Sequence, residues 1–429
     1  MRGSFGIFGK STVAALSLAT ALVAGGAVLG AGAAVAKEAK ATNSPEFVKA
    51  AQALQKAVAD VTASKDKAAA QAVIGQLAAA EGSVKTPADR IIYGQWQQQV
   101  GGVAGDGALQ QKGLQNMLDS GQLPADKVGM VGYFLGVTAY QNKDYASAVK
   151  ALSPVVAANY SDDSAAEILA ASYAEQGQNA QAIDSLKAAM AARKAAGGAI
   201  PDSWFKRANL IAYNGKLGPQ AIEMSTMQVA TDPSPINWLG AGQLVREFGN
   251  FTKEESLDLG RLFLRTGALD TDPKYTSREF IEYIQAADPR RLPGEVQKVA
   301  ELGIAKGALL TSDPFVTDSL TQAKGRVAAD KASLAALEKD GRASPNGKSA
   351  VATADAYLSY GEDAKAEEMY QIALTKGGID TDRALTRLGI AQVDLGKTAE
   401  AQATFAKVGG VRAPLAKLWS VYASKKTAQ

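Results

Sequence analysis

Apolar residues recur at helical spacing along most of the chain. Near the C-terminus, one face of a helical projection carries Leu415, Leu418, Trp419 and Tyr422, while Lys417 falls outside it. An apolar stripe of this kind is typical of a helix that buries one side. No stretch of useful length shows the two-residue alternation of a strand. The pattern therefore predicts an all-α protein, with a helix over residues 413–424.

The helical pattern also repeats at a fixed interval. Leu135 corresponds to Leu169 and Ala148 to Ala182, each pair 34 residues apart. Small side chains at such positions let two helices of a pair approach closely. Gly177 follows the first helix of the second unit, where a left-handed cap favours glycine. A period of this length indicates an array of helix pairs.

The same spacing returns later in the chain. Ala366 and Ala401 lie 35 residues apart, and Trp204 and Trp238 in the weaker middle region lie 34 apart. Four Asp-Pro pairs are predicted to begin helices, because Asp caps a helix and Pro fits its first turn. These pairs begin at Asp232, Asp272, Asp288 and Asp313.

The repeat resembles the tetratricopeptide repeat. The residues that carry the resemblance in the clearest unit are Leu169, Ala170, Tyr173, Gly177, Ala182, Leu186 and Ala189. The resemblance implies an α-solenoid, a right-handed superhelix of helical hairpins, in which the helix over 413–424 caps the last apolar face. It also implies that the protein binds other proteins and has no chemistry of its own.

The pattern divides the chain into five segments. We expect the superhelix to be either continuous or divided around residues 324–348. A glycine-rich stretch, Gly101 to Gly107, is expected to be a turn between helices. The segments are a signal peptide over 1–36, divergent helical hairpins over 37–125, repeats over 126–270, an irregular helical segment over 271–345, and C-terminal repeats with the capping helix over 346–429.

The N-terminus has the features of a secretory signal. Arg2 and Lys10 precede a short apolar run, and Ala34-Val35-Ala36 forms a cleavage site of small residues. Cleavage after Ala36 would place the protein in the periplasm or outside the cell. An uncleaved membrane anchor is the alternative, and only in that case would the protein contact a membrane.

Composition narrows the chemistry. The chain has no Cys and no His, which excludes disulfides, Cys-ligated metals and His-dependent catalytic triads. Removal of residues 1–36 would leave 44 bases and 43 acids. We therefore expect no metal, no cofactor and no nucleic-acid partner. The central bases are expected to form surface pairs with nearby acids; they are Arg261, Arg265, Arg278, Arg290 and Arg291.

The resemblance places the first helix of each repeat on a concave groove that holds a partner peptide or helix. Packing between repeats is the alternative role for its aromatic residues, as is a solvated face for its acids. The carboxylate-binding set of some family members is missing here, because those places hold Tyr133, Val137, Glu167 and Ala171. The expected groove residues are Tyr133, Val137, Tyr140, Glu167, Glu175, Lys206, Leu210, Tyr213, Asp355, Leu358 and Ile390.

These features favour a non-enzymatic binding scaffold of the cell envelope. The alternative is a cell-wall enzyme, or an assembly factor for peptidoglycan or exopolysaccharide, related to the lytic transglycosylases that carry a helical superhelix. Those enzymes need only one catalytic Glu, and Glu255-Ser256 resembles their Glu-Ser motif. The residues that follow Ser256 differ from the family's Gly-Leu-Met-Gln stretch.

Overall fold

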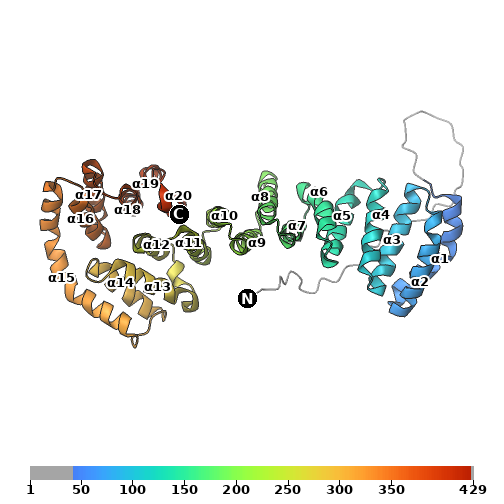
Figure 1. The fold of residues 1–429 in the computed structure, drawn as a ribbon, viewed down its shortest axis with the longest axis horizontal. Coiled ribbons are helices and arrows are strands. Elements are labelled where there is room, and N and C mark those ends of the chain that lie inside the picture. Colours follow the sequence, from blue (N-terminus) through green and yellow to red (C-terminus); the bar gives the residue numbers. More distant parts are fainter. Residues whose placement is uncertain (1–41, 427–429) are drawn as a thin grey trace, which may run out of the picture. The chain divides into compact units, whose positions relative to one another are not determined.

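The computed structural model describes residues 42–426, and the expected signal peptide lies outside this range. Within it, helices follow one another and no strand occurs, so the all-α prediction is confirmed. Successive helices pack against each other in pairs (Figure 1). The chain divides into two compact units, which meet in the sequence between Ala199 and Ile200. Residues 324–348, where a division was the alternative to a continuous superhelix, lie within the second unit.

Unit 1 covers the described residues up to 199. Its helices are α1 (Pro45–Ser64), α2 (Lys67–Ala80), α3 (Pro87–Ala104), α4 (Gly107–Asp119), α5 (Ala125–Gln141), α6 (Tyr145–Ala157), α7 (Ser164–Glu175) and α8 (Asn179–Ala195).

Unit 2 covers the described residues from 200 onward. Its helices are α9 (Asp202–Asn214), α10 (Gly218–Thr231), α11 (Pro235–Gly249), α12 (Lys253–Arg265), α13 (Pro273–Ala287), α14 (Pro293–Ala305), α15 (Pro314–Ala343), α16 (Lys348–Ser359), α17 (Asp363–Lys376), α18 (Thr381–Asp394), α19 (Thr398–Phe405) and α20 (Ala413–Lys426).

Small side chains sit where the paired helices touch. The four alanines that define the repeat are all fully buried; they are Ala148, Ala182, Ala366 and Ala401. A Cβ added at Gly136 would lie 2.3 Å from Cγ of Leu152, and one added at Gly389 would lie 2.4 Å from the ring of Phe405. Gly177 has a φ of 75° just beyond the end of α7. The predicted role of these small residues is confirmed.

Local capping decides where several helices begin. Asp272 and Asp313 accept backbone hydrogen bonds at the starts of α13 and α15, as predicted. The Asp232-Pro233 pair lies just before α11, which begins at Pro235 instead. The prediction that Asp288 begins a helix is wrong. Asp288 follows the last residue of α13 as its cap, and its carboxylate accepts a hydrogen bond from the backbone N–H of Arg290 at 2.9 Å.

The glycine-rich turn is shorter than predicted. Helix α3 continues to Ala104, so Gly101 and Gly102 lie inside it and only Gly105 and Asp106 make the turn. The missing side chain at Gly101 serves the packing of two helices instead of a turn. An added Cβ there would lie 2.9 Å from the backbone nitrogen of Gln110, so glycine lets α4 approach α3.

Helix α20 is buried along its predicted stripe. Leu415, Leu418 and Trp419 are fully buried, and Tyr422, the last residue of the stripe, is half-buried. The helix covers α19, as a capping helix should, and it also contacts α10, α11 and α12 (Figure 1). Helix α18 contacts α12 as well. The last repeats of unit 2 therefore return to its earlier helices.

Candidate functional site

An open groove crosses three first helices of unit 2, α9, α11 and α13. The groove has a volume of about 790 Å³. Each of these helices presents the same side to it, which follows from their equivalent places in successive repeats. The groove side chains that matter most below are Lys206, Leu210, Tyr213, Ile236, Arg246, Lys274, Tyr275, Arg278 and Glu279.

Large apolar side chains in this groove are exposed to water. Leu210 is 44% exposed, Tyr213 50%, Ile236 53% and Tyr275 51%. Single exposed apolar residues are common on protein surfaces, whereas several gathered in one hollow are less usual. The ring of Tyr213 lies edge-on to Phe248 with 6.2 Å between centroids, so one side of this ring packs against the protein.

Charged side chains surround these apolar ones and are mostly paired. Lys206 lies 2.6 Å from Asp202, and Arg278 lies 2.6 Å from Glu282. Arg246 reaches both Glu279 and Glu282. Paired charges leave little net field in the groove. An apolar centre with a polar rim is the usual anatomy of a protein-binding surface.

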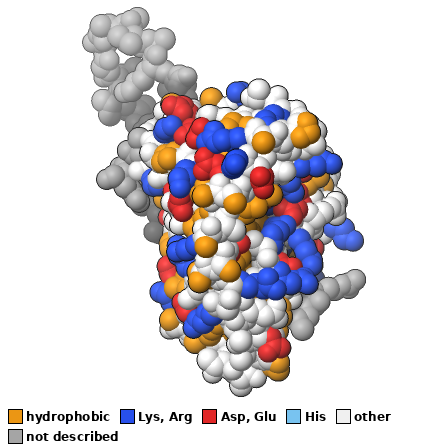
Figure 2. All heavy atoms as spheres, turned by 90° about the vertical axis from the view of Figure 1, so that its left-hand side faces the viewer, with side chains coloured by type: hydrophobic (Ala, Val, Ile, Leu, Met, Phe, Trp, Pro, Cys, Tyr) orange, Lys and Arg blue, Asp and Glu red, His pale blue; other side chains and the backbone are white. Residues whose placement is uncertain are grey.

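Charges of both signs are also mixed elsewhere on the surface. Figure 2 shows Lys and Arg side chains interspersed with Asp and Glu over one face of the molecule. This mixture agrees with the formal net charge of only +3.

A second feature of unit 2 is a buried ionic core centred on Asp258. This side chain is fully buried between three guanidinium groups. Its carboxylate lies 2.9 Å from Nε of Arg387, 2.7 Å from Nη1 of Arg412 and 3.1 Å from Nη1 of Arg261. Burial opposes the ionised form, but these three positive charges outweigh it and lower the pKa of Asp258 to about 2.

Other helices join the core through the same arginines. Arg387 on α18 also reaches Asp355 on α16 at 2.6 Å and Glu254 on α12 at 2.7 Å. Arg261 on α12 makes two hydrogen bonds to Glu295 on α14, at 2.8 and 2.7 Å. The ionic core thus joins α12, α14, α16 and α18 to one another and to Arg412, which lies directly before α20, and every acid named here has a basic partner. That arrangement holds helices together and leaves none of these carboxylates free to act as an acid or base.

The prediction of surface pairs for the central bases is partly wrong. Arg278, Arg290 and Arg291 do pair with acids near the surface. Arg261 is 1% exposed, and Arg265 is mostly buried against Asp394. The reason is the return of α16 to α20, which covers one side of α12. Pairing could be inferred from neighbouring acids, but burial depends on helices more than 100 residues away in sequence.

The predicted groove residues of unit 1 lie in mixed surroundings. Tyr133 hydrogen-bonds Ser164 at 2.7 Å, and Tyr140 packs with Tyr145 at 5.5 Å between ring centroids. Val137 is 9% exposed. These contacts agree with the packing alternative. The two acids of the set are more accessible to solvent than Val137, because Glu167 is half-buried and Glu175 is exposed.

The predicted groove residues of unit 2 separate into two groups. Lys206, Leu210 and Tyr213 line the open groove. Asp355, Leu358 and Ile390 are buried, at 7%, 4% and 0% exposure. Asp355 also accepts a hydrogen bond from Tyr370 at 2.6 Å. A partner could not reach Asp355 or Ile390 without opening unit 2.

Two apolar groove residues were not predicted. Ile236 follows Pro235 directly, and Tyr275 lies two residues after Pro273. Both stand in the first turn of a first helix, before the residues that the repeat pattern aligns. Ile236 and Tyr275 could have been predicted as groove residues from one feature of the sequence, a large apolar residue just after a proline that begins a helix.

Glu255, the residue suggested by the Glu-Ser resemblance, has a structural role. It forms a capping box with Thr252, because its carboxylate accepts a hydrogen bond from the backbone N–H of Thr252 at 2.9 Å. It also lies 3.0 Å from Arg412 and is 6% exposed. These contacts fix the start of α12 and hold the residue away from water.

Among residues 42–426, no group of acids is arranged to hold a metal ion. No helix in that same range combines the length and apolar character that crossing a bilayer requires.

Comparison with known proteins gives matches among solved structures only. No protein-family model matches the chain, and no curated protein does either. The TPR2AB domain of yeast Sti1, solved in a complex with pHSP90, is 13% identical, with a TM-score of 0.25, over 71% of this chain and 97% of that one. Naa15/Naa10 bound to HypK-THB is 15% identical, with a TM-score of 0.31, over 89% and 70%. The C-terminal part of a TPR repeat-containing protein from Cytophaga hutchinsonii is 14% identical, with a TM-score of 0.30, over 70% and 99%.

The repeat and the helix pairs define the class of protein. Consecutive helices pack in pairs, and small residues at the repeat positions lie at their contacts. The chain is therefore an all-α solenoid of tetratricopeptide-like helix pairs. Solenoids of this kind are scaffolds whose stacked helices present extended surfaces.

Proposed function

We propose that the protein is a non-catalytic scaffold of the cell envelope that binds an apolar-rich segment of a partner protein in the groove of α9, α11 and α13. The observation that carries the proposal is the group of four large apolar side chains that face this groove and stay exposed; they are Leu210, Tyr213, Ile236 and Tyr275.

The energetics of the groove favour an apolar occupant. Each of these side chains is about half exposed, so a partner could still remove much of its apolar surface from water. Full burial of one large apolar side chain contributes roughly 1.5–3 kcal/mol. Tyrosines add area at a low cost in side-chain entropy, which makes them frequent anchors of interfaces.

A matched pair of variants tests the groove. The full chain carries Ile236→Asp in one form and Leu310→Asp in the other, because Leu310 is also exposed in unit 2, at 66%, but lies outside the groove. Each form is cross-linked in native envelope and purified. We expect a partner enriched with the wild type to be lost with Ile236→Asp and retained with Leu310→Asp. Equal retention by both would contradict the proposal.

Export is supported by the N-terminal sequence alone. The charged start, the apolar run and Ala34-Val35-Ala36 predict a mature chain that begins at Lys37. The mass of the protein recovered from the envelope fraction checks this. A full-length mass in that fraction would favour the anchor instead.

The enzyme alternative has a direct assay. Incubation of the purified protein with peptidoglycan should release no soluble fragments if the scaffold proposal holds. Release of fragments that is lost in Glu255→Gln, with an unchanged circular dichroism spectrum, would overturn it.

A further inference from the structure

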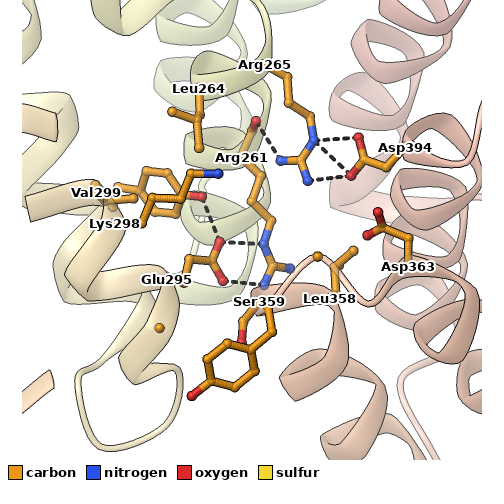
Figure 3. Close-up of a pocket in the computed structure, with 14 residues that line it drawn as sticks. Arg261, Leu264, Arg265, Glu295, Lys298, Val299, Leu358, Ser359, Asp363 and Asp394 are labelled. Carbon is orange, nitrogen blue, oxygen red and sulfur yellow. Dashed lines mark hydrogen bonds and ion pairs between the residues drawn. The ribbon is translucent and has the colours of Figure 1, made fainter. Parts of the chain in front are cut away.

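A second hollow in unit 2 is lined by charged side chains. It has a volume of about 650 Å³ and lies among α12, α14, α18 and the turn between α16 and α17 (Figure 3). It shares no lining residue with the groove of α9, α11 and α13. Its charged lining residues are Arg261, Arg265, Glu295, Lys298, Asp363 and Asp394.

Four of these six side chains already satisfy one another. Arg261 binds Glu295 through two hydrogen bonds. Arg265 binds Asp394, with its Nε 2.9 Å from Oδ1 and its Nη2 2.5 Å from Oδ2 (Figure 3). These two pairs cancel in charge and need no ligand.

Lys298 and Asp363 are the remaining charges of the lining. Within residues 42–426, neither side chain makes an ion pair or a hydrogen bond. Oδ1 of Asp363 is shielded from water and has no hydrogen-bond partner. A shielded oxygen without a partner costs free energy, so it marks a place where a donor would be bound favourably.

Among the residues that the structure describes, no positive charge near Asp363 forms an ion pair with its carboxylate. Burial, together with the negative charge of Asp394, raises the pKa of this carboxyl, although Arg265, Lys426 and Lys298 act in the other direction. Arg265 is already bound to Asp394, and Nζ of Lys426 donates to the carbonyl of Val393 at 3.0 Å. Neither base forms an ion pair with Asp363.

We propose that this hollow binds a small zwitterion, an amino acid or short peptide with free ends, whose ammonium group meets Asp363 and whose carboxylate meets Lys298. The two side chains come from different helices, α17 and α14, and Figure 3 shows them on opposite sides of the paired arginines. One unpaired charge of each sign is matched by a ligand that carries both. A simple anion would leave the shielded oxygen of Asp363 without a partner, and a simple cation would leave Lys298 facing only water.

The size and walls of the hollow suit such a ligand. Ligand pockets commonly measure about 300–1,000 Å³, and this one falls within that range. Leu264 and the ring of Tyr360, which are both half-buried, add apolar surface beside the charged groups. That surface would contact the aliphatic part of the ligand.

Calorimetric titration of the full chain tests the proposal. The probes are alanine, dialanine and trialanine, whose terminal charges lie progressively farther apart. We expect at least one of them to bind. Acetylation of its amine or amidation of its carboxylate should each weaken binding by about tenfold or more, because a charged partner in the hollow is then left unmatched.

Paired variants locate the binding. Asp363→Asn and Lys298→Gln should each weaken binding of the same probe by about tenfold or more. Asp318→Asn and Lys407→Gln serve as controls, since both residues are exposed and lie outside the hollow. Melting curves show whether each variant is folded. Because Lys298 is exposed, its loss should not unfold unit 2.

Three results would overturn the proposal. The first is that no probe binds the wild type at millimolar concentration. The second is that both hollow variants bind the probe as well as their controls do. The third is that the amidated probe binds as well as the free one, which would indicate a site for a cation alone, such as a basic side chain of a partner. The groove experiment is unaffected by any of these results, because the two sites share no residue.

Discussion

The two units use the same helix pair but hold their helices together differently. In unit 1, helices contact their neighbours and next neighbours along the chain. In unit 2, Arg387 reaches Asp258 across 129 residues, and the indole N–H of Trp419 donates to the backbone carbonyl of Asp258 at 3.2 Å across 161 residues. Unit 1 is thus a linear stack, whereas the end of unit 2 is fastened to its earlier helices.

This difference decides which surfaces remain open to a partner. The repeat places equivalent residues on every first helix, but the ionic core takes those of α16 and α18 into the interior, as Asp355 and Ile390 show. The first helices α9, α11 and α13 are left with exposed apolar residues. An equivalent position in a repeat therefore does not imply an equivalent exposure.

The largest effect is expected from Asp258→Asn. This change leaves Arg387, Arg412 and Arg261 facing one another without the central charge, and breaking a buried ion pair in this way costs about 3–5 kcal/mol. Hydrogen exchange of the full chain should rise in α12, α18 and α20 and stay unchanged in α5 to α8. Asp318→Asn on the surface of α15 should leave both regions unchanged. Equal loss of protection in the two units would contradict the comparison.

A methyl group at the helix contacts should have the next largest effect, and it should act in both units. Gly136→Ala in unit 1 and Gly389→Ala in unit 2 each place a Cβ within 2.4 Å of a neighbouring side chain. Overpacking of this kind costs about 1–3 kcal/mol. Urea unfolding monitored by circular dichroism measures the loss. If either variant matched the wild type, close approach of the helices would not be needed at that pair.

Because of Glu254, lowering the pH should remove stability from unit 2 that unit 1 does not lose. Burial opposes ionisation of this residue, but Arg387 and Arg291 outweigh it and lower its pKa to about 2. The unfolded value is about 4.3, so ionised Glu254 stabilises unit 2 above about pH 4, and this contribution is lost as the pH falls towards 2.

Glu254→Gln should therefore flatten the acid dependence of unit 2. At pH 7 it should cost only about 1 kcal/mol, because the side chain is partly exposed. Tryptophan fluorescence in urea suits the measurement, since Trp204, Trp238 and Trp419 report on unit 2 and only Trp96 on unit 1. If the stability of unit 2 fell as steeply between pH 5 and pH 2 in Glu254→Gln as in the wild type, Glu254 would contribute nothing to holding the helices of unit 2 together.

The smallest effect is expected from Gly75→Ala, and its sign is opposite. Gly75 lies inside α2, and no atom lies within 4 Å of an added Cβ. Alanine should therefore stabilise unit 1 by about 0.5–1 kcal/mol, because it restricts the unfolded chain and favours the helix. A loss of stability in thermal unfolding would mean that the space beside this helix is not open.

Much of the fold could be predicted from local pattern, and much of the site could not. Ala148, Ala182, Ala366 and Ala401 indicated the helix pairs correctly because their spacing reflects contacts between neighbouring helices. Lys206 and Tyr213 were placed in a groove from the same register.

The ionic core needed information that a repeat does not contain. Arg387 and Asp258 meet only because α18 returns to α12, and nothing in a period of 34 or 35 residues specifies this long-range contact. For the same reason, Asp355 and Ile390 were assigned to a groove although they are buried. The hollow at Asp363 could not be predicted for the same reason, since it forms only where the last helices of unit 2 return to α12 and α14.

The central claim is that a partner segment occupies the groove of α9, α11 and α13. Photo-crosslinking in the native envelope tests it most directly, with a photoreactive residue replacing Tyr213 in one form of the protein and Leu337 on α15, outside the groove, in the other. The account predicts that Tyr213 yields one discrete adduct whose mapped peptide is rich in apolar residues, and that Leu337 does not yield it. The same adduct from both positions, or no adduct from Tyr213, would contradict it.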